Sequence, residues 1–211
     1  MDFDTVINNR KTNFTWTDQE IDKDKIKSII NNTLSKVPSK QKRMPYKIDV
    51  FDYSDKELRK EIFLHTKRDS KLTDEQDSYN PQILAPILLV FSMRNGVQAL
   101  AKLNKRITEA DKYGYKKNKR VIFMEMGIVS MSLMLALEAE GFATGFCECI
   151  ENKKELASKL NLSYPVDLMM GVGYPSTKEN YIDPNTNTVK DVYWEHEHKR
   201  PSLDDVVTYR F

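Results

Sequence analysis

Residues 121–150 read VIFMEMGIVSMSLMLALEAEGFATGFCECI, and our prediction of the fold starts from this stretch. From Met126 to Leu137 nearly every side chain is apolar or small. Such a segment leaves neither helix face for water, so it predicts a buried helix. The run is shorter than the roughly 20 residues that a bilayer span needs, so we expect no membrane span. Gly141 follows the last periodic residue and predicts the end of the helix there, in the left-handed conformation.

A helix with no polar face must be covered on all sides. The chain of 211 residues can supply that cover as one domain over residues 1–211 or as half of a dimer core. Its composition is that of a globular protein, with 40% hydrophobic residues, 30% charged residues and a net charge of +2. This balance argues against a dedicated nucleic-acid binder, which carries a concentrated basic face.

The N-terminal residues, the cysteines and the histidines indicate the cellular compartment and whether a metal is bound. The N-terminal residues MDFDTVINNR have no basic region followed by an apolar core, so we expect no signal peptide and a cytoplasmic protein. We interpret Cys147 and Cys149 as reduced thiols. His196 and His198 have no third ligand at a recognisable spacing, so we predict no metal site.

Hydrophobic periodicity predicts an alternation of helices and strands along the rest of the chain. Residues 83–91 carry no polar side chain and predict a central strand, with Pro86 among its first residues because proline cannot donate to the ladder. Thr17 precedes Gln19 and Glu20 and predicts an N-cap. The expected helices are 2–9, 17–35, 55–66 and 152–160, and the expected strands are 46–51, 142–150 and 166–175. We expect residues 92–120 to form a helical excursion or lid with its tip near residues 113–115, and residues 176–190 to form a polar loop.

Two short motifs bear on function. Arg10, Lys11 and Thr12 place two cations and a hydroxyl at the end of the first helix, where they could hold a phosphate through charge-assisted hydrogen bonds or could simply be a solvated pair. Gly171 and Gly173 lie within a predicted strand, with no following helix and no third glycine. We therefore interpret them as positions of close backbone packing and not as a dinucleotide-binding loop.

The order of all these elements resembles the nitroreductase family of flavin mononucleotide (FMN) enzymes. The resemblance covers essentially the full chain and is most specific in its last three motifs. The motifs that carry it are Asn9-Arg10-Lys11-Thr12, Ser39 to Pro45-Tyr46, Asn80 with Ala85-Pro86, Leu135 to Ala143, Gly173-Tyr174-Pro175, and Lys199-Arg200-Pro201 followed by Leu203-Asp204-Asp205-Val206-Val207.

The resemblance implies an α+β fold with a central, mostly antiparallel sheet flanked by helices around a long buried central helix. It implies a homodimer with its sites at the subunit interface and with the tail, residues 194–211, crossing to the partner. It implies an oxidoreductase that carries hydride from NADH or NADPH through flavin N5, in a ping-pong reaction, to a small nitroaromatic- or quinone-like acceptor. The chemistry then belongs to the flavin, and we predict no catalytic side chain. The cofactor-binding residues that it implies are Arg10, Lys11, Thr12, Ser39, Gln41, Asn80, Glu148, Cys149, Ile150, Lys199 and Arg200.

The chain departs from the family pattern at several of these positions. Residues 39–46 lack most of the small hydroxyl and amide groups of the family loop, and Glu148 and Cys149 stand where the family often has two glycines. Two alternatives therefore stay open. One is a flavin-free or weakly flavin-binding regulatory protein on the same fold. The other is a flavin enzyme of different chemistry, such as a dehalogenase, a flavin destructase or a ring dehydrogenase.

Overall fold

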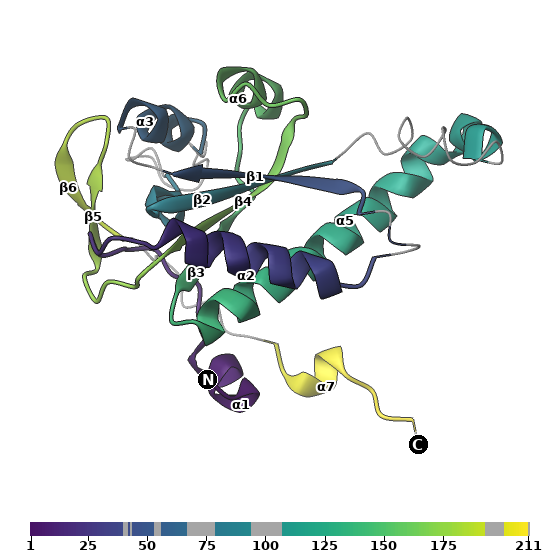
Figure 1. Cartoon of the computed structure of the whole chain (residues 1–211), viewed down its shortest axis with the longest axis horizontal. Helices are drawn as coiled ribbons and strands as arrows, with labels where there is room; N and C mark the ends of the chain where they lie inside the picture. Colours follow the sequence, from purple (N-terminus) through teal and green to yellow (C-terminus); the bar gives the residue numbers. More distant parts are fainter. Residues whose placement is uncertain are drawn as a thin grey trace.

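A four-stranded antiparallel sheet forms the centre of the molecule, and helices lie on both of its faces (Figure 1). The computed structural model describes residues 1–39, 42, 44–52, 56–66, 79–93, 107–192 and 201–210. The strand order is β1-β2-β4-β3, and β5 and β6 form a separate hairpin. The elements are α1 (Phe3–Asn9), α2 (Lys23–Lys36), β1 (Tyr46–Asp52), α3 (Lys56–Leu64), the 3-10 helix η2 (Pro81–Leu84), β2 (Ile87–Met93), α5 (Ile107–Ala139), β3 (Ala143–Cys147), α6 (Lys153–Lys159), β4 (Val166–Gly173), β5 (Asn180–Asp183), β6 (Thr188–Asp191) and α7 (Leu203–Val206).

Strand β2 is central, as its apolar sequence predicts, and is buried on both faces. It pairs with β1 on one side and β4 on the other, both antiparallel. The strand begins at Ile87 and not at residue 83, because Pro86 has no N–H for the ladder and residues 81–84 form η2 instead.

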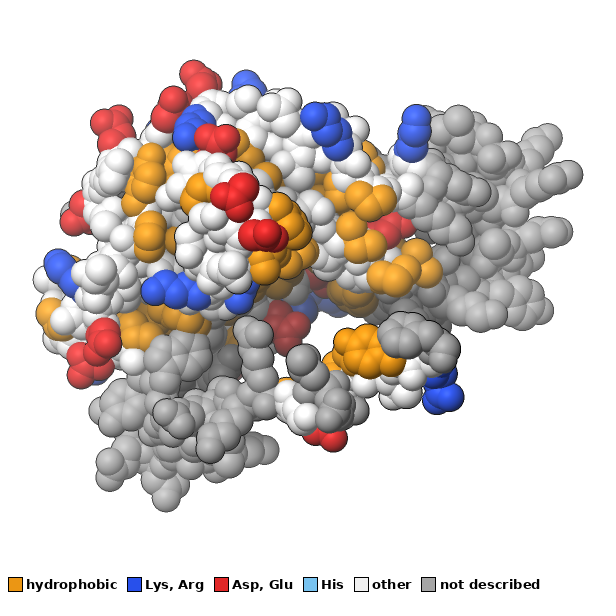
Figure 2. Space-filling model, turned by 90° about the horizontal axis from the view of Figure 1, so that it is seen from below, with side chains coloured by type: hydrophobic (Ala, Val, Ile, Leu, Met, Phe, Trp, Pro, Cys, Tyr) orange, Lys and Arg blue, Asp and Glu red, His pale blue; other side chains and the backbone are white. Residues whose placement is uncertain are grey.

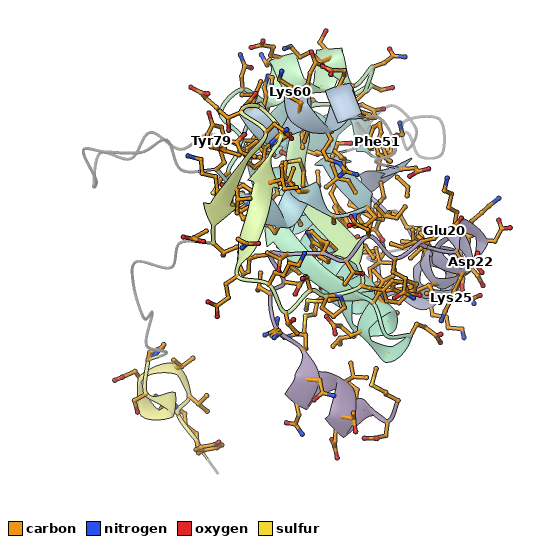
Figure 3. All side chains as sticks on the ribbon, turned by 90° about the vertical axis from the view of Figure 1, so that its left-hand side faces the viewer. Glu20, Asp22, Lys25, Phe51, Lys60 and Tyr79 are labelled. Atoms are coloured by element: carbon orange, nitrogen blue, oxygen red, sulfur yellow. The ribbon has the colours of Figure 1, made fainter. Side chains whose placement is uncertain are left out.

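The two faces of the sheet bury two apolar clusters. Side chains from α2 and α5 pack with Leu89, Phe91 and Met170 on one face. Side chains from α3 and α6 pack with Leu88 and Val90 on the other. On that second face Phe63 stacks on Tyr79, with ring centroids 4.7 Å apart, and meets Tyr181 of the hairpin at 5.9 Å (Figure 3 labels Tyr79). This packing joins the hairpin to the body of the molecule, and burial raises the pKa of Tyr181 to about 12.

Glycines on β3 and β4 allow other backbone segments to lie directly on the sheet. Gly145 and Gly171 are cross-strand partners. A Cβ at Gly145 would lie 2.2 Å from the backbone oxygen of Asn13, and one at Gly171 would lie 2.0 Å from that of Gln82. A Cβ at Gly173 would lie 2.7 Å from the Pro86 ring. The prediction of close packing at Gly171 and Gly173 is confirmed.

Helix α5 ends as the sequence predicts. Gly141 has φ +87°. The N–H of Phe142 donates to the Leu137 carbonyl oxygen at 3.0 Å, and that of Gly141 donates to Glu138 at 3.0 Å, which is the Schellman arrangement. Lys25 of α2 pairs with the Glu140 carboxylate at 2.9 Å and lies over the Phe142 ring (Figure 3).

The expectation that no face of this helix is left for water does not hold in the single chain. Val129, Leu133 and Leu137 are fully buried against the sheet. The opposite side carries four large apolar side chains that are 38–59% exposed, which we call the α5 stripe: Phe123, Met124, Ile128 and Met131. Figure 2 views this side of the molecule and shows hydrophobic side chains gathered on it. By length and composition alone Val121–Ala139 could cross a membrane, but its buried side belongs to the core.

Other expectations are corrected in detail. Asp22, not Thr17, caps α2, because its carboxylate accepts from the N–H groups of Asp24 and Lys25. Residues 176–190 include the β5–β6 hairpin, which their polar sequence did not indicate. Residues 113–115 lie inside α5 and form no tip. Residues 94–106 and 193–200 fall outside the described part of the chain, so the predicted lid and the crossing of the tail stay predictions.

The close approach at Gly171 predicts a large loss of stability for Gly171→Ala. The new methyl group must displace the η2 backbone, so we expect the free energy of unfolding to fall by about 3 kcal/mol or more. Gly141→Ala is the matched control. Its Cβ meets nothing within 4 Å, and only the left-handed backbone opposes it, at about 1–2 kcal/mol. Chemical denaturation measures both, and equal losses would contradict the close approach.

Candidate functional site

The basic segment after α1 lies beside the start of β3. The Arg10 N–H closes α1 by donating to the Val6 carbonyl oxygen at 3.0 Å. Thr12 then pairs with Thr144 in a parallel bridge, and the Asn13 N–H donates to the Thr144 carbonyl oxygen at 2.8 Å. Arg10 is half-buried, whereas Lys11 and Thr12 are exposed. The three predicted phosphate ligands therefore lie together at one edge of the sheet.

The two cations of this segment have no ion-pair partner among the described residues. The charges of both cations act on Glu138, in the last turn of α5. Burial raises the pKa of its carboxyl, while a hydrogen bond from the Thr144 N–H and the charges of Arg10 and Lys11 lower it. One carboxyl oxygen, Oε1, is buried and has no hydrogen-bond partner.

Reasoning from the sequence missed Glu138. A signal was available, because a carboxylate in the last turn of a helix faces the negative end of the helix dipole. No basic residue occupies the last turn of α5 to offset it.

Residues 148–150 follow β3 directly, at the end of the strand away from Thr144. Glu148 is exposed, Cys149 is half-buried and Ile150 is buried in the core. The next residue, Glu151, holds the end of this loop, because its N–H donates to the His65 carbonyl oxygen at 2.9 Å. Glu148 is four positions after Thr144, and extended chain spans about 13 Å over that distance. Neither cysteine forms a disulfide within the described part of the chain.

Asn80 lies buried between η2 and the end of α3. Its Nδ2 donates to the Thr66 carbonyl oxygen at 3.2 Å, and its Oδ1 accepts from Gln82 Nε2 at 3.3 Å. Gln82 Nε2 also donates to the Phe146 carbonyl oxygen at 2.8 Å. Asn80 is therefore connected to the end of β3, near Glu148, but its side chain already has partners within the protein. Its predicted contact with the flavin stays a prediction.

Ser39 is likewise engaged within the chain. Its hydroxyl donates to the buried Glu125 carboxylate at 2.7 Å and accepts from the Met44 N–H at 2.8 Å. Met44 has a positive φ of 44°. The structure thus joins the loop before β1 to α5 through Ser39. Of the other predicted ligands, Gln41, Lys199 and Arg200 lie outside the described residues.

The bonds of Asn80 predict a structural cost for Asn80→Leu even without a cofactor. Replacing the amide leaves the Thr66 carbonyl and the Gln82 amide without these buried partners, so we expect the free energy of unfolding to fall by about 2–4 kcal/mol. The measurement is denaturation of flavin-free protein. Asn152→Ala, which removes an exposed N-cap on α6, should cost about 1 kcal/mol. Unchanged stability of Asn80→Leu would show that the amide does not hold the fold.

The nitroreductase family model matches residues 7–174. Among curated proteins none has a significantly similar sequence. A nitroreductase family protein from Streptococcus pneumoniae TIGR4 superposes with a TM-score of 0.70 at 17% identity, over 99% of this chain and 100% of that one.

Two further solved structures have cofactors in their names. A predicted nitroreductase from Exiguobacterium sibiricum, solved in complex with FMN, has a TM-score of 0.67 at 16% identity, over 100% of this chain and 98% of that one. A mutant of the FMN- and NADPH-dependent nitroreductase NfnB from a Sphigopyxis strain has a TM-score of 0.65 at 13% identity, over the whole of both chains. These likenesses confirm the α+β fold, and with a family model that spans most of its length, the chain belongs to the nitroreductase family.

Proposed function

We propose that this protein is a cytoplasmic, FMN-dependent oxidoreductase that uses NADH or NADPH to reduce a small nitroaromatic- or quinone-like acceptor. The observation that carries the proposal is the pair of cations at Arg10 and Lys11, which have a hydroxyl beside them at Thr12 and no ion pair among the described residues. Family membership and the cofactors in the names of similar structures support it.

The donor set fits a flavin phosphate. A phosphate carries close to two negative charges, and a guanidinium beside an ammonium and a hydroxyl offers charge-assisted bonds to several of its oxygens. Lys199 and Arg200 are proposed to add two cations to the same subsite. The protein would thus fix one end of the cofactor near the start of β3.

The other end of β3 is proposed to hold the isoalloxazine ring. The backbone of residues 148–150 is proposed to face the polar centre of the isoalloxazine, and the separation of about 13 Å from Thr144 leaves room for a ribityl chain. When bound, FMN would take hydride from one substrate and pass it to the other, so the protein's own part would be to bind and orient the cofactor and to exclude water. Ser39, Gln41 and Asn80 are proposed as further contacts with FMN. Ser39 and Asn80 would then have to bond to FMN in addition to their present partners in the protein.

We also propose that the protein acts as a homodimer through the α5 stripe. Four large apolar side chains at helical spacing on one side of α5 form an exposed hydrophobic surface, which is typical of an interaction site. The tail that includes α7 carries further exposed apolar residues, Val206, Val207 and Tyr209, and is proposed to cross to the partner. Residues 92–120 are proposed as a lid, of which residues 107–120 belong to α5.

One observation favours a second candidate, a protein of this fold that binds flavin weakly or not at all. The hydroxyl of Ser39 and the amide of Asn80, two of the predicted flavin ligands, are occupied by internal hydrogen bonds. The first experiment below distinguishes the two candidates.

FMN binding tests the cofactor. The purified protein should retain flavin absorbance after FMN is added and the sample is desalted. Arg10→Met should weaken FMN binding by about tenfold or more, because a charged hydrogen bond contributes about 1.5–3 kcal/mol. Riboflavin, which lacks the phosphate, should bind both proteins equally. No retained flavin in the parent would sink the oxidoreductase proposal in favour of the second candidate.

The dimer has its own test. Ile128→Asp places a charge in the middle of the α5 stripe and should raise the dimer dissociation constant by at least about thirtyfold, equivalent to roughly 2 kcal/mol. Sedimentation equilibrium measures it. Ile182→Asp is the control, since Ile182 on the hairpin is 61% exposed and lies outside the stripe. A parent protein that is monomeric, or a dimer that tolerates Ile128→Asp, would contradict the proposed interface.

A further inference from the structure

Gln82 of η2 is a buried amide that lies directly on two glycines of the sheet. The residue is 6% exposed. A Cβ at Gly145 would lie 2.6 Å from the Gln82 Cβ, and one at Gly171 would lie 2.0 Å from the Gln82 carbonyl oxygen. The bare backbone at these two positions therefore lets Gln82 contact β3 and β4 closely, and the close packing leaves its side chain little room to move.

The side-chain nitrogen of Gln82 makes two hydrogen bonds. It donates to the Phe146 carbonyl oxygen at 2.8 Å and to Asn80 Oδ1 at 3.3 Å. A backbone carbonyl can only accept, so Phe146 decides which end of the Gln82 amide faces β3. Gln82 Oε1 is left buried without a hydrogen-bond partner. Because an unpaired buried acceptor is unfavourable, what glutamine offers here over an apolar side chain of similar size is its pair of N–H donors.

A second backbone carbonyl orients Asn80 in the same way. Asn80 Nδ2 donates to the Thr66 carbonyl oxygen at 3.2 Å. Asn80 Oδ1 therefore faces Gln82, and the bond between the two side chains agrees with the orientation that Thr66 imposes. An amide nitrogen carries two hydrogens, and the second hydrogen of Asn80 Nδ2 has no partner among the described residues. This arrangement leaves one N–H of Asn80 for a ligand.

From this geometry we infer that Gln82 is a positioning residue for the isoalloxazine ring, which acts by holding the Asn80 amide with its second N–H turned to the ring. The bond to Phe146 fixes Gln82 to β3, two positions before Glu148. Asn80 is thereby fixed relative to the strand that leads to residues 148–150. The inference rests on the proposed function in taking Asn80 as a contact of the flavin.

A fixed donor at the ring has a predictable effect on the flavin, because hydrogen bonds to the ring tune its electronics. Reduction adds electron density to the ring, and a donor bonds more strongly to an acceptor of greater negative charge. The N–H of Asn80 therefore favours the reduced flavin over the oxidised one. Gln82 should raise the reduction potential of the bound flavin through Asn80, without touching the ring itself.

The test replaces Gln82 with methionine, which keeps the length of the side chain and lacks the N–H donors. FMN and riboflavin share the ring, so we expect Gln82→Met to weaken the binding of both by the same factor, about five- to tenfold. We expect the reduction potential of bound FMN to fall by about 20 mV, which corresponds to a fivefold change in the ratio of the affinities for reduced and oxidised flavin.

Thr15→Val is the matched control for a loss of structure. It removes a buried hydroxyl that donates to the Lys178 carbonyl oxygen at 2.7 Å and has no bond to Gln82 or Asn80. It should leave the dissociation constants of both flavins within about twofold of the parent, because the contacts of the ring are unchanged.

A double-mutant cycle separates positioning from an effect on the fold. In an Asn80→Ala background, Gln82→Met should change riboflavin binding by less than about twofold, because the group through which Gln82 acts is already removed. Equal effects in both backgrounds would contradict the inference. If the double variant does not fold, the reduction potential of Gln82→Met alone decides, and an unchanged potential overturns the inference.

The failure of this inference and that of the proposed function give different results. If the parent retains no flavin, the proposed function is wrong and the inference falls with it. If the parent binds FMN and Gln82→Met binds both flavins within about twofold of the parent, the inference is wrong and the proposed function stands. An effect on FMN without one on riboflavin would indicate an action at the phosphate and would also contradict the inference.

Discussion

The contact of bare backbone with the β3–β4 surface is the constraint on which the rest of this structure depends. Gly145 and Gly171 face each other across the two strands, and any side chain there would collide with Asn13 or Gln82. Because these positions carry no Cβ, the N-terminal segment and η2 can both lie on the sheet. The first contact places Arg10 and Thr12 at the start of β3. The second places Asn80 and Gln82 near its end, so one surface without side chains sets both ends of the candidate site.

Local sequence signals predicted the parts of the fold that local chemistry decides. Gly141 takes the predicted positive φ, and Gly171 and Gly173 lie where a side chain would collide, as the sequence predicts. Pro86 stands just before β2 and not within it, because it has no amide hydrogen for the ladder. The central position of β2 follows from the same kind of reasoning, since an apolar strand needs cover on both faces. The choice of Asp22 over Thr17 as the cap of α2 is harder to predict, because two acceptable cap residues stand only five positions apart and packing selects between them.

The partners of polar side chains were not predictable in this way. Ser39 bonds to Glu125 across 86 positions of sequence, and Asn80 bonds to a carbonyl 14 positions earlier. Both depend on how distant segments meet, which no local pattern contains. The exposure of the α5 stripe has a related cause. A run of apolar residues indicates that a surface must be covered, but does not indicate whether the same chain or another one covers it.

Helix α5 carries both the exposed stripe and a carboxyl of the candidate site. Met131 of the exposed stripe and Glu138 of the site are seven residues apart, a rise of about 10 Å along a continuous helix. No glycine or proline lies between them to act as a hinge. The Schellman turn at Gly141 then fixes the end of the helix to β3. The same continuous helix therefore carries both the proposed subunit interface and the carboxyl beside the basic segment.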